Sequence, residues 1–427
     1  MPTIKFHTLG CKVNQYETQA IREACLKRGF KEAGNGKADC YVINTCTVTS
    51  AADRKSREYI YRSVRENPKA KVIVTGCYVE KDRDKITGIE GVDLIISNEQ
   101  KNVISDLLLS KEIKPVGRNN QKFTDLEISN FFDHDKAFVK IQDGCDNHCS
   151  YCKVSVVRGR SRSRDFQSIV KETERLIKNG FQEIVLTGIC LGAYGRDLKQ
   201  GTDLVSVIDS IEKLDGDFRI RLSSIEAKDV TDKLIDRIAG SKKMCRHLHI
   251  PFQSGDDSVL KKMNRKYTAE SYIELVNRIR KEIPQIAITT DIMVGFTQET
   301  EKRFKNTVGF LKEIKPSRVH IFPFSPREHT PAYCFGERID SATTKARMLI
   351  LQGLAREMSY QYRKKFLHKI LEVLVEQQIE KETGFFQGYS DNYIKTFINS
   401  KKPILGNKLK KVKITAVTPD SSLSVPV

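Results

Sequence analysis

The sequence contains no hydrophobic run that approaches the length of a membrane span, and its first residues, Met1–His7, lack the apolar segment of a secretion signal. These absences predict a protein without membrane segments that stays in the cytoplasm. With 39% hydrophobic and 30% charged residues, the 427-residue chain has the composition of a soluble globular protein. Its length predicts roughly two to four domains.

Acidic residues are in deficit, because 54 Asp and Glu stand against 73 Lys and Arg, for a net charge of +19. This excess favours a polyanionic partner, although a merely basic, well-solvated surface would give the same count. Four alternating arginines could hold phosphates through their two-pronged guanidinium groups: Arg158, Arg160, Arg162 and Arg164.

The eleven cysteines come without any sign of an oxidising compartment, which favours metal or redox chemistry over disulfides. Cys145, Cys149 and Cys152 are separated by three and then two residues, and Tyr151 stands directly before the last of them. This spacing fits three ligands of a [4Fe–4S] cluster, and no fourth cysteine follows locally, so one iron could take a ligand that is not protein. The alternatives are a zinc site, which usually closes with four ligands, and buried inert thiols.

The first hundred residues predict a parallel α/β domain, because strand-like runs alternate with helical patterns. The strands are expected at Ile4–Leu9, Tyr41–Asn44, Val72–Thr75 and Val92–Ile96, and the helices at Tyr16–Lys27 and Ala51–Arg65.

Cys11, Cys46 and Cys77 come immediately after the first three of these strands. In a parallel sheet such positions share the carboxyl edge, where ligands bind in open α/β folds. A second iron–sulfur cluster with three protein ligands is the sharper interpretation, and three unrelated buried thiols are the alternative. The remaining cysteines have no common location and are expected to be core thiols: Cys25, Cys40, Cys190, Cys245 and Cys334.

Residues 113–135 are polar and are expected to form a linker. Six strand-like runs follow, separated by helical patterns such as Phe166–Lys178, for which Asp165 is the expected N-cap. The six runs are Phe138–Ile141, Glu183–Leu186, Arg219–Leu222, His247–Ile250, Ala287–Thr290 and Val319–Phe322. Six strand–helix units predict an incomplete (β/α) barrel, whose active site lies at the carboxyl ends of the strands. The Cys145 triad follows the first strand and is expected at that mouth.

The tail, residues 363–427, predicts a small β-barrel with strands at Ile370–Val375, Gly388–Thr396 and Lys411–Val417. It holds 12 Lys and Arg against six Asp and Glu, an excess of six positive charges. Three aromatic residues interleave with its lysines, as on a nucleic-acid surface, although they could equally fill the barrel core: Tyr389, Tyr393 and Phe397.

Motifs along nearly the whole chain resemble the radical S-adenosylmethionine (SAM) methylthiotransferases. They are Thr8–Glu17, Asn44–Thr49, Thr75–Cys77, Gly144–Tyr151, Arg158–Arg160, Leu186–Gly188, Ser223–Glu226, His249–Gly255 and Thr289–Asp291. The resemblance implies an α/β chain with a methylthiotransferase domain at 1–112, a linker at 113–135, a radical SAM (β/α)6 barrel at 136–362 and a TRAM RNA-binding module at 363–427.

Three groups of this family act on tRNA isopentenyladenosine, on a ribosomal protein aspartate, and on tRNA threonylcarbamoyladenosine. The motif Gly-Cys-Lys-Val-Asn-Gln around Cys11 is most similar to the corresponding motif of the third group, which modifies adenosine 37 of the anticodon loop. The implied reaction is methylthiolation of C2 of N6-threonylcarbamoyladenosine. The other two substrates stay open as alternatives, as does a non-catalytic iron–sulfur RNA-binding protein.

By resemblance, a cluster on the Cys145 triad would reduce one SAM to give a 5′-deoxyadenosyl radical. A second cluster, on the Cys11 triad, would carry sulfur that a second SAM methylates. The implied partners are tRNA and an electron donor such as a flavodoxin or ferredoxin, while the sulfur donor is not identified. The implied SAM contacts are Tyr151, Thr187, Gly188, Ser224, Glu226, Gln253 and Asp291. His247 and His249 are expected to be hydrogen-bonded core residues.

The chain also departs from the family pattern. The usual Ile-Ile-Pro after the third cluster cysteine is Lys153-Val154-Ser155, the usual Pro-Gly pair becomes Thr297-Gln298, and His329 replaces a common glycine. Loss of proline and glycine changes backbone freedom, so these departures are expected to affect loop shape and substrate fit rather than the class of reaction.

Overall fold

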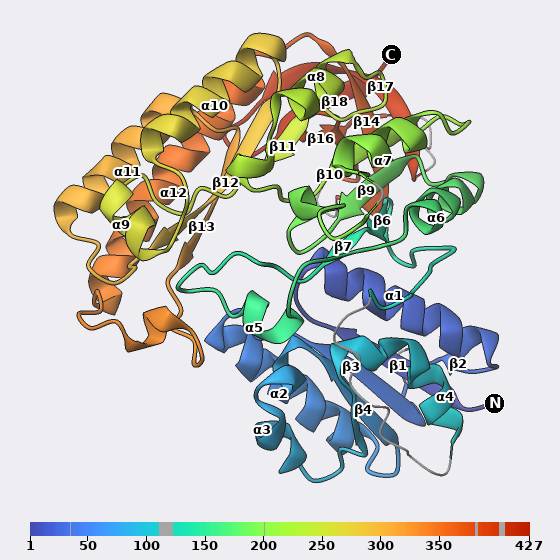
Figure 1. The fold of residues 1–427 in the computed structure, drawn as a ribbon. Helices are drawn as coiled ribbons and strands as arrows, with labels where there is room; N and C mark the ends of the chain where they lie inside the picture. The colour runs from blue at the N-terminus through green and yellow to red at the C-terminus, as the bar shows by residue number, and fades with distance from the viewer. Residues whose placement is uncertain (35, 111–122, 200, 381–382, 401–405) are drawn as a thin grey trace.

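The computed structural model describes residues 1–34, 36–110, 123–199, 201–380, 383–400 and 406–427. Of the expected linker, residues 113–122 lie outside them, and in the described part Leu126, Ile128 and Phe131 are buried in the barrel core. The chain forms an N-terminal α/β domain, an open parallel barrel and a small closed barrel, in that order (Figure 1). Among the described residues, no helix has both the length and the apolar character to cross a membrane.

The N-terminal domain is a five-stranded parallel sheet in the order β2-β1-β3-β4-β5. Its strands are β1 (Thr3–Thr8), β2 (Lys31–Glu32), β3 (Cys40–Thr45), β4 (Lys71–Gly76) and β5 (Leu94–Ile95). Its helices are α1 (Lys12–Lys27), α2 (Ser50–Glu66), α3 (Arg83–Thr87) and α4 (Ile104–Leu109), with short 3-10 turns at Cys77–Glu80 and Asn98–Val103. Two separate cores cover the two faces of the sheet, one beneath α1 and α4 and the other beneath α2 and α3.

The barrel contains the six predicted parallel strands. They are β6 (Ala137–Lys140), β9 (Glu183–Thr187), β10 (Arg219–Leu222), β11 (His247–His249), β12 (Ala287–Val294) and β13 (Arg318–Pro323). Two three-stranded sheets, β10-β9-β6 and β11-β12-β13, are joined by a parallel bridge between Ile220 and Met244. In the described residues β6 and β13 do not pair with each other, so the barrel is incomplete, as predicted.

Helices cover the outside of these strands. They are α6 (Phe166–Lys178), α7 (Leu204–Glu212), α8 (Asp232–Gly240), α9 (Asp257–Lys262), α10 (Ala269–Glu282), α11 (Glu301–Ile314) and α12 (Ser341–Lys364). The short helix α5 (Val154–Arg158) instead packs against the turn at Cys77–Glu80 of the N-terminal domain. Short 3-10 turns occur at Leu191–Ala193, Ala227–Asp229 and Pro331–Cys334. The start of α6 is capped by Asp165, whose carboxylate accepts a hydrogen bond from the Ser168 amide at 2.8 Å, as predicted.

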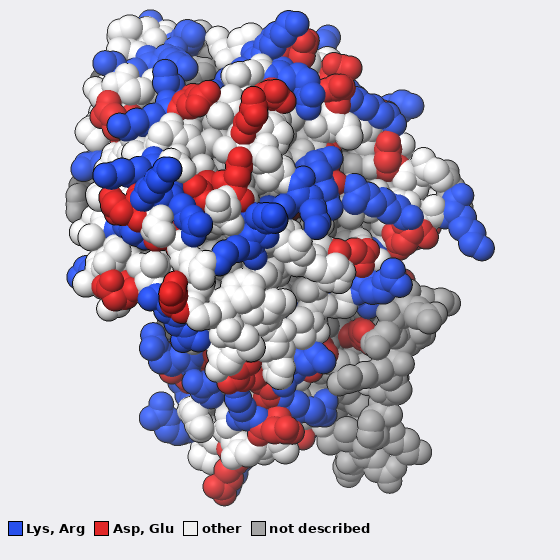
Figure 2. Space-filling model, turned by 60° about the vertical axis from the view of Figure 1, so that its left-hand side comes forward, with Lys and Arg blue, Asp and Glu red and all other residues white. Residues whose placement is uncertain are grey.

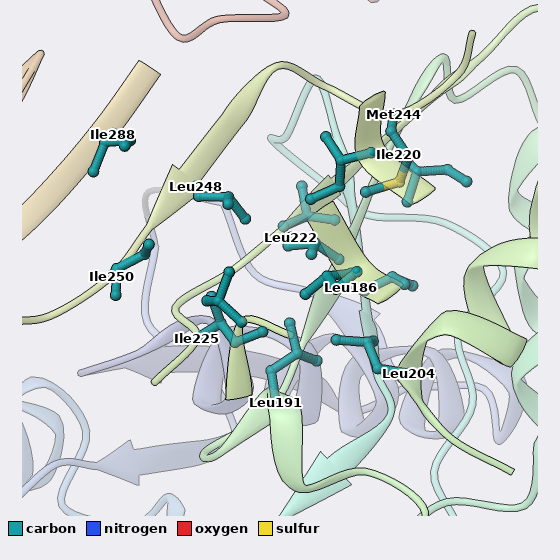
Figure 3. Close-up of a cluster of buried hydrophobic side chains, with 14 of the residues drawn as sticks. Leu186, Leu191, Leu204, Ile220, Leu222, Ile225, Met244, Leu248, Ile250 and Ile288 are labelled. Atoms are coloured by element: carbon teal, nitrogen blue, oxygen red, sulfur yellow. The ribbon is translucent and has the colours of Figure 1, made fainter. Parts of the chain in front are cut away.

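The barrel core lies between strands and helices (Figure 3). Ile220 and Leu222 alternate along β10 with Arg219 and Arg221, and all four side chains are buried. Successive residues of a strand point to opposite faces, so the aliphatic residues face the helices while the arginines face the barrel interior. The inner face is therefore polar, which is unusual for a packed barrel and suits a binding cavity.

The tail is a closed five-stranded barrel in the order β14-β15-β16-β18-β17. Its strands are β14 (Ile370–Ile379), β15 (Phe386–Ser390), β16 (Lys395–Ile398), β17 (Lys408–Val417) and β18 (Ser422–Pro426). The single strand predicted over Gly388–Thr396 is wrong, because a turn divides it into β15 and β16. Tyr393 has a left-handed φ of 62°, and the Ile394 amide donates to Ser390 Oγ at 2.9 Å. Neither β2 nor β18 was predicted.

Two tail aromatics meet the larger barrel. The ring of Tyr393 stacks on His247 with centroids 4.5 Å apart, and it lies 5.2 Å from the ring of Tyr389. Arg219 donates to the Tyr389 carbonyl at 2.7 Å and Arg221 to the Ser390 carbonyl at 3.0 Å. These two tyrosines were expected on an RNA surface or in the small core. They instead join the tail to the parallel barrel.

Candidate functional site: two cysteine triads at a domain junction

The Cys145 triad lies on the loop between β7 (Gln142–Asp143) and β8 (Arg162–Ser163), directly after β6. The Cys145 amide donates to the Gly159 carbonyl at 3.0 Å, and the Ser150 amide donates to the Met263 carbonyl at 3.0 Å. Gly144 has a φ of 73°, and a Cβ there would stand 1.9 Å from the Arg160 carbonyl oxygen. Only glycine fits this close approach, so the loop is held in one shape on the mouth of the barrel.

Hydrogen-bond donors point at two of the three sulfurs. The Asn147 amide donates to Cys145 Sγ at 3.4 Å, and Arg265 Nη1 donates to Cys149 Sγ at 3.2 Å. A hydrogen bond from Cys190 lowers the pKa of Cys145 to about 7, whereas burial raises the pKa of Cys152 to about 12. Thiolates are the form that binds iron, and the hydrogen bonds to Cys145 stabilise that form.

The Cys11 triad lies at the carboxyl edge of the N-terminal sheet. Cys46 and Cys77 directly follow the paired strands β3 and β4, and Cys11 is the N-cap of α1 beyond the neighbouring strand β1. A Cβ on Gly10 would meet Cys46 Sγ at 3.0 Å, so the Cys11 and Cys46 loops touch. The Asn14 side chain ties the same two loops together by donating to the Leu9 carbonyl at 2.7 Å and to the Thr45 carbonyl at 3.0 Å.

Arg158 joins the two triads. It ends α5, which begins two residues after Cys152, and its Nε donates to Cys77 Sγ at 3.2 Å. Its Nη1 contacts the Glu17 carboxylate at 2.5 Å. Burial alone would raise the pKa of Glu17, but Arg158, Lys101 and Lys140 hold it well below its usual range. The Glu17 carboxylate is therefore charged. Its buried ion pairs with Arg158, Lys101 and Lys140 connect the N-terminal domain to the loop that carries the Cys145 triad.

The expectation that four alternating arginines hold phosphates is wrong for three of them. Arg158 is occupied as described, and Arg164 is buried in an ion pair with Glu172 at 2.6 Å. Arg162 is buried and donates to the Arg158 carbonyl at 2.9 Å. Only the Arg160 side chain, 93% exposed, is open to a ligand. Arg158 ends helix α5 and Arg162 belongs to β8, so the alternation in sequence does not place the four side chains on one surface.

Three of the proposed SAM contacts, Thr187, Gly188 and Ser224, lie at or just after strand ends, whereas Tyr151 lies on the loop that carries the Cys145 triad. Thr187 ends β9, and its carbonyl accepts the Ile141 amide at 2.9 Å. Gly188 has no space for a side chain, since its Cβ would stand 2.9 Å from Gln142 Oε1. The exposed Ser224 pairs by a parallel bridge with His249. Tyr151 is half-buried and packs edge-on against Phe296.

Glu226 and Cys149 line one 230 Å³ cavity together with Arg265. Arg265 bridges them, since it donates to Glu226 Oε2 at 2.6 Å as well as to Cys149. Sequence reasoning missed Arg265, because an isolated arginine between a turn and a helix carries no pattern.

Gln253 and Asp291 belong to the β11-β12-β13 side of the barrel, where Gln253 forms a parallel bridge with Ile292 and Asp291 lies in β12. Gln253 has a left-handed φ of 79°, and its buried Oε1 has no hydrogen-bond partner within the described structure. A strained backbone conformation and a buried hydrogen-bond acceptor without a partner are typical of ligand-binding sites. Asp291 accepts from His249 Nε2 at 3.2 Å. His247 is a buried, hydrogen-bonded core residue as predicted, whereas His249 is only half-buried.

Two departures from the family pattern place a non-glycine residue in a strained backbone conformation. Gln298 and His329 both adopt left-handed φ values, of 64° and 68°. This conformation costs a non-glycine residue roughly 1–2 kcal/mol, so these loops keep a glycine-like shape without glycine. Ser155 and Thr297 have ordinary backbone conformations, and the former lies within α5.

The remaining cysteines are core thiols as expected, with one exception. Cys25, Cys40 and Cys245 are buried, but Cys334 is exposed. Cys190 is buried beside Cys145 and receives a hydrogen bond from Asn147 Nδ2 at 3.7 Å, so it belongs to the surroundings of the first triad.

Comparison with known proteins agrees with this arrangement. Residues 139–311 match the radical SAM superfamily, and residues 3–97 match uncharacterized protein family UPF0004. The chain is 40% identical to the threonylcarbamoyladenosine tRNA methylthiotransferase MtaB of Bacillus subtilis, over 97% of this chain and 94% of the relative. It is 36% identical to MtaB of Thermotoga maritima, over 92% and 91%. The tRNA-2-methylthio-N(6)-dimethylallyladenosine synthase of Natranaerobius thermophilus is 34% identical, over 96% and 94%.

Among solved structures, the radical SAM methyltransferase TsrM from Kitasatospora setae is similar with a TM-score of 0.58 and 14% identity, over 77% of this chain and 76% of that one. This likeness concerns the fold alone. The radical SAM superfamily carries a [4Fe–4S] cluster and SAM. Three features of this site are compatible with these cofactors: the unpaired Oε1 of Gln253, the hydrogen bond from Arg265 to Cys149, and the loop shape that requires Gly144. Full-length identity and the arrangement of the site together place the chain in the radical SAM methylthiotransferase family, in its threonylcarbamoyladenosine tRNA group.

Proposed function

We propose that this protein methylthiolates C2 of N6-threonylcarbamoyladenosine at position 37 of tRNA, giving 2-methylthio-N6-threonylcarbamoyladenosine. The observation that carries the proposal is the near full-length identity of 40% to a relative named for this activity. The adenine C2–H bond is neither acidic nor easily attacked, so insertion of sulfur needs radical chemistry from a cofactor. SAM serves both as radical source and as methyl donor.

Two [4Fe–4S] clusters are part of the proposal, one on Cys145, Cys149 and Cys152 and the other on Cys11, Cys46 and Cys77. Bound to these cysteines, the clusters would supply the electron that cleaves SAM and an iron site for the transferred sulfur. The convergence of three cysteines at adjoining strand ends supports the second cluster.

Side chains of the protein would hold the clusters and SAM in position. Arg265 donates to Cys149 and is oriented by Glu226, while Arg158 donates to Cys77 across the domain junction. SAM is assigned to the mouth between Tyr151, Thr187, Gly188, Ser224, Glu226, Gln253 and Asp291. In that position the unpaired Oε1 of Gln253 would accept a hydrogen bond from SAM or substrate.

The same proposal includes partners and organisation. The units are the N-terminal domain at 1–112, a linker at 113–135, the radical SAM barrel at 136–362 and a TRAM module at 363–427 that contacts tRNA. A flavodoxin or ferredoxin in the cytoplasm supplies electrons. The closed tail barrel, with exposed Lys410, Lys411 and Lys413 on β17, supports an RNA-binding role.

The test is an anaerobic assay with reconstituted protein, SAM and a chemical reductant. Threonylcarbamoylated tRNA, isopentenylated tRNA and the ribosomal protein are offered in separate reactions, and nucleosides or peptides are analysed by mass spectrometry. We expect methylthiolation of the first substrate. Turnover confined to either of the others would replace the substrate assignment, and the absence of 5′-deoxyadenosine in all reactions would favour a non-catalytic iron–sulfur protein.

A further inference from the structure

The N-terminal domain contacts both edges of the incomplete barrel. At one edge, α1 packs on the edge strand β6. At the other edge, the loop that follows β13 reaches the beginning of α2, which starts shortly after Cys46. Because β6 and β13 do not pair with each other in the described residues, the N-terminal domain connects the two edges where the barrel is open.

Arg327 makes the main contact of the β13 loop with the N-terminal domain. Its Nη1 donates to Ser50 Oγ at 2.9 Å and its Nη2 to Thr47 Oγ1 at 3.0 Å, and the guanidinium also pairs with the Asp53 carboxylate. The side chains of Arg327 and Thr47 are buried. Since Thr47 directly follows Cys46, this arginine of the barrel binds the segment that leaves a proposed cluster ligand.

Two weaker contacts join the same loop to the N-terminal domain. The Ser50 amide donates to Ser325 Oγ at 3.1 Å, and Lys85 pairs with Glu328 at 2.9 Å. The side chains of Lys85 and Glu328 are about half exposed, and such surface pairs contribute little to stability. The charges of the Arg327 contact are mostly buried, so the loss of one partner would leave the other uncompensated. Arg327 therefore dominates the attachment of this loop.

The N-terminal domain is also attached to the barrel through α5 and the residue before it. Arg158 donates to Cys77 Sγ at 3.2 Å, and the buried Lys153 pairs with the buried Asp82 at 2.5 Å. The two attachments thus hold different cysteine loops, since the α5 contacts hold that of Cys77 and the β13 loop holds that of Cys46. Together they fix an orientation of the N-terminal domain that one attachment alone would leave free to rotate.

We propose that Arg327 is a positioning residue for sulfur transfer, because it holds the segment after Cys46 at a fixed place relative to the barrel mouth. The inference rests on the proposed function, in which the radical forms at the barrel and the N-terminal domain carries the sulfur. Sulfur transfer depends on the distance across this domain junction, whereas cleavage of SAM requires only the barrel and its cysteine triad. Loss of the Arg327 contact should therefore reduce sulfur transfer and spare SAM cleavage.

The test compares two products of the reconstituted full-length protein with SAM, a chemical reductant and threonylcarbamoylated tRNA under anaerobic conditions. For Arg327→Gln we expect methylthiolation to slow about ten- to a hundredfold, as for a misplacement of about 1 Å, while 5′-deoxyadenosine formation changes less than about twofold. Arg327→Lys should recover part of the loss, because lysine keeps the charge next to Asp53. Thr47→Val removes only the hydroxyl acceptor, and its effect should be less than additive with that of Arg327→Gln.

Arg338→Gln is the matched control, because Arg338 is an exposed arginine of the same connection and donates to the Tyr333 carbonyl. Amide hydrogen exchange of the reconstituted proteins gives a second measurement that does not depend on activity. Residues 47–53 should exchange faster in Arg327→Gln than in the wild type and should be unchanged in Arg338→Gln. Iron content should equal that of the wild type in both variants.

A proportional fall of both products in Arg327→Gln, or a loss of iron, would overturn the proposal, because Arg327 would then only stabilise the fold. An unchanged ratio of the two products despite faster exchange would overturn it as well, since the contact would order the segment without affecting transfer. Failure of the proposed function is a distinct result, in which the wild-type protein does not methylthiolate the tRNA. The proposal then falls with it, and the exchange data still report on the contact itself.

Discussion

Arg158 and Arg160 are two residues apart, yet the side chain of Arg158 is buried and that of Arg160 is exposed. Arg158 is buried among Glu17, Asp143 and Cys77, and Arg160 is 93% exposed with Asp146 at 3.7 Å. Taking a charge out of water is costly unless it is paired, so each member of the Arg158 network depends on the others. The sequence shows only alternating arginines, and only the docking of the N-terminal domain decides which of them becomes buried.

Arg158→Leu should therefore lower the free energy of unfolding by about 3–5 kcal/mol, because it leaves buried Glu17 and Asp143 short of a positive partner. Arg160→Leu should change it by less than about 0.5 kcal/mol. Thermal unfolding of both variants under identical conditions measures the difference. Equal melting temperatures would mean that water or a shifted lysine replaces the guanidinium.

The two triads should be separable by iron content and by product. Wild-type protein should bind about eight irons after anaerobic reconstitution, and replacement of Cys145, Cys149 and Cys152 by alanine should leave about four and abolish cleavage of SAM. Replacement of Cys11, Cys46 and Cys77 should also leave about four but keep SAM cleavage while sulfur transfer stops. The exposed Cys334→Ala variant is the control and should match the wild type. If the Cys145 triple variant still forms 5′-deoxyadenosine, the reductive site lies elsewhere.

His7 should contribute an acid-sensitive term to stability. Its ring lies 4.8 Å from that of Tyr59, its Nε2 has no partner in the described structure, and burial lowers its pKa from 6.5 to about 4. Above pH 6.5 the imidazole is neutral both folded and unfolded. As pH falls from 6.5 toward 4, the unfolded chain takes up a proton that the folded one resists, so stability is lost. The effect at pH 5 is about 1–2 kcal/mol after allowance for solvent screening.

His7→Phe removes this proton uptake and keeps an aromatic ring. The melting temperature of the variant relative to wild type should therefore rise between pH 7 and pH 5. A difference that stays constant over this range would show that His7 titrates normally in the folded protein.

At the scale of elements, periodicity predicted the six barrel strands and the helices around them. Arg219–Leu222 and Phe166–Lys178 have the expected bounds. The elements that were predicted wrongly or missed are those in which the local sequence pattern carries little information about secondary structure. β2 has two residues and exists because it pairs with β1, and the β15–β16 turn depends on a left-handed Tyr393 rather than on glycine. The positions of the cysteines could be predicted because strand ends in a parallel sheet converge, whereas the position of Arg265 depends on tertiary structure alone.

The β7–β8 hairpin tests how strictly the cluster loop is shaped. Gly144→Ala would place a methyl group 1.9 Å from the Arg160 carbonyl oxygen, at a φ of 73°. We expect the loop to be displaced and iron binding at the Cys145 triad to be lost. Gly180→Ala is the control, because Gly180 also has a positive φ, of 93°, but has open space around it. It should cost only about 1–2 kcal/mol of backbone strain and leave iron content unchanged.

For the whole molecule, the tail is a structural part of the barrel as well as a candidate RNA module. Arg219 and Arg221 are buried between Glu183 and carbonyl groups of the tail, and His247 is covered by Tyr393. Deletion of the tail would leave buried cations facing water and the bottom of the barrel uncovered. Point substitutions on its outer surface are therefore the cleaner way to separate RNA binding from folding.

Lys411 and Lys413 are exposed on β17, on either side of the buried Val412, so their side chains point away from the tail core. Basic side chains also occur elsewhere, and on the face shown in Figure 2 they are interspersed with acidic ones. Contacts to phosphate release counterions, so each lost contact should reduce the slope of log affinity against log salt by about 0.7–0.9. Replacing both lysines by alanine should thus weaken tRNA binding and make its salt dependence shallower by about 1–2.

The matched control is Lys302→Ala with Lys305→Ala, which removes two exposed lysines from α11 and the same total charge. Binding of labelled tRNA is titrated at several salt concentrations for wild type and both double variants, and SAM cleavage without tRNA is followed in parallel. A local phosphate contact predicts that only the β17 variant changes slope, while uncoupled SAM cleavage stays the same in all three, because the cysteine triads lie in other domains. Equal changes in both variants would mean that tRNA responds to the net charge of the protein, and the tail would then lose its assignment as the RNA-binding module.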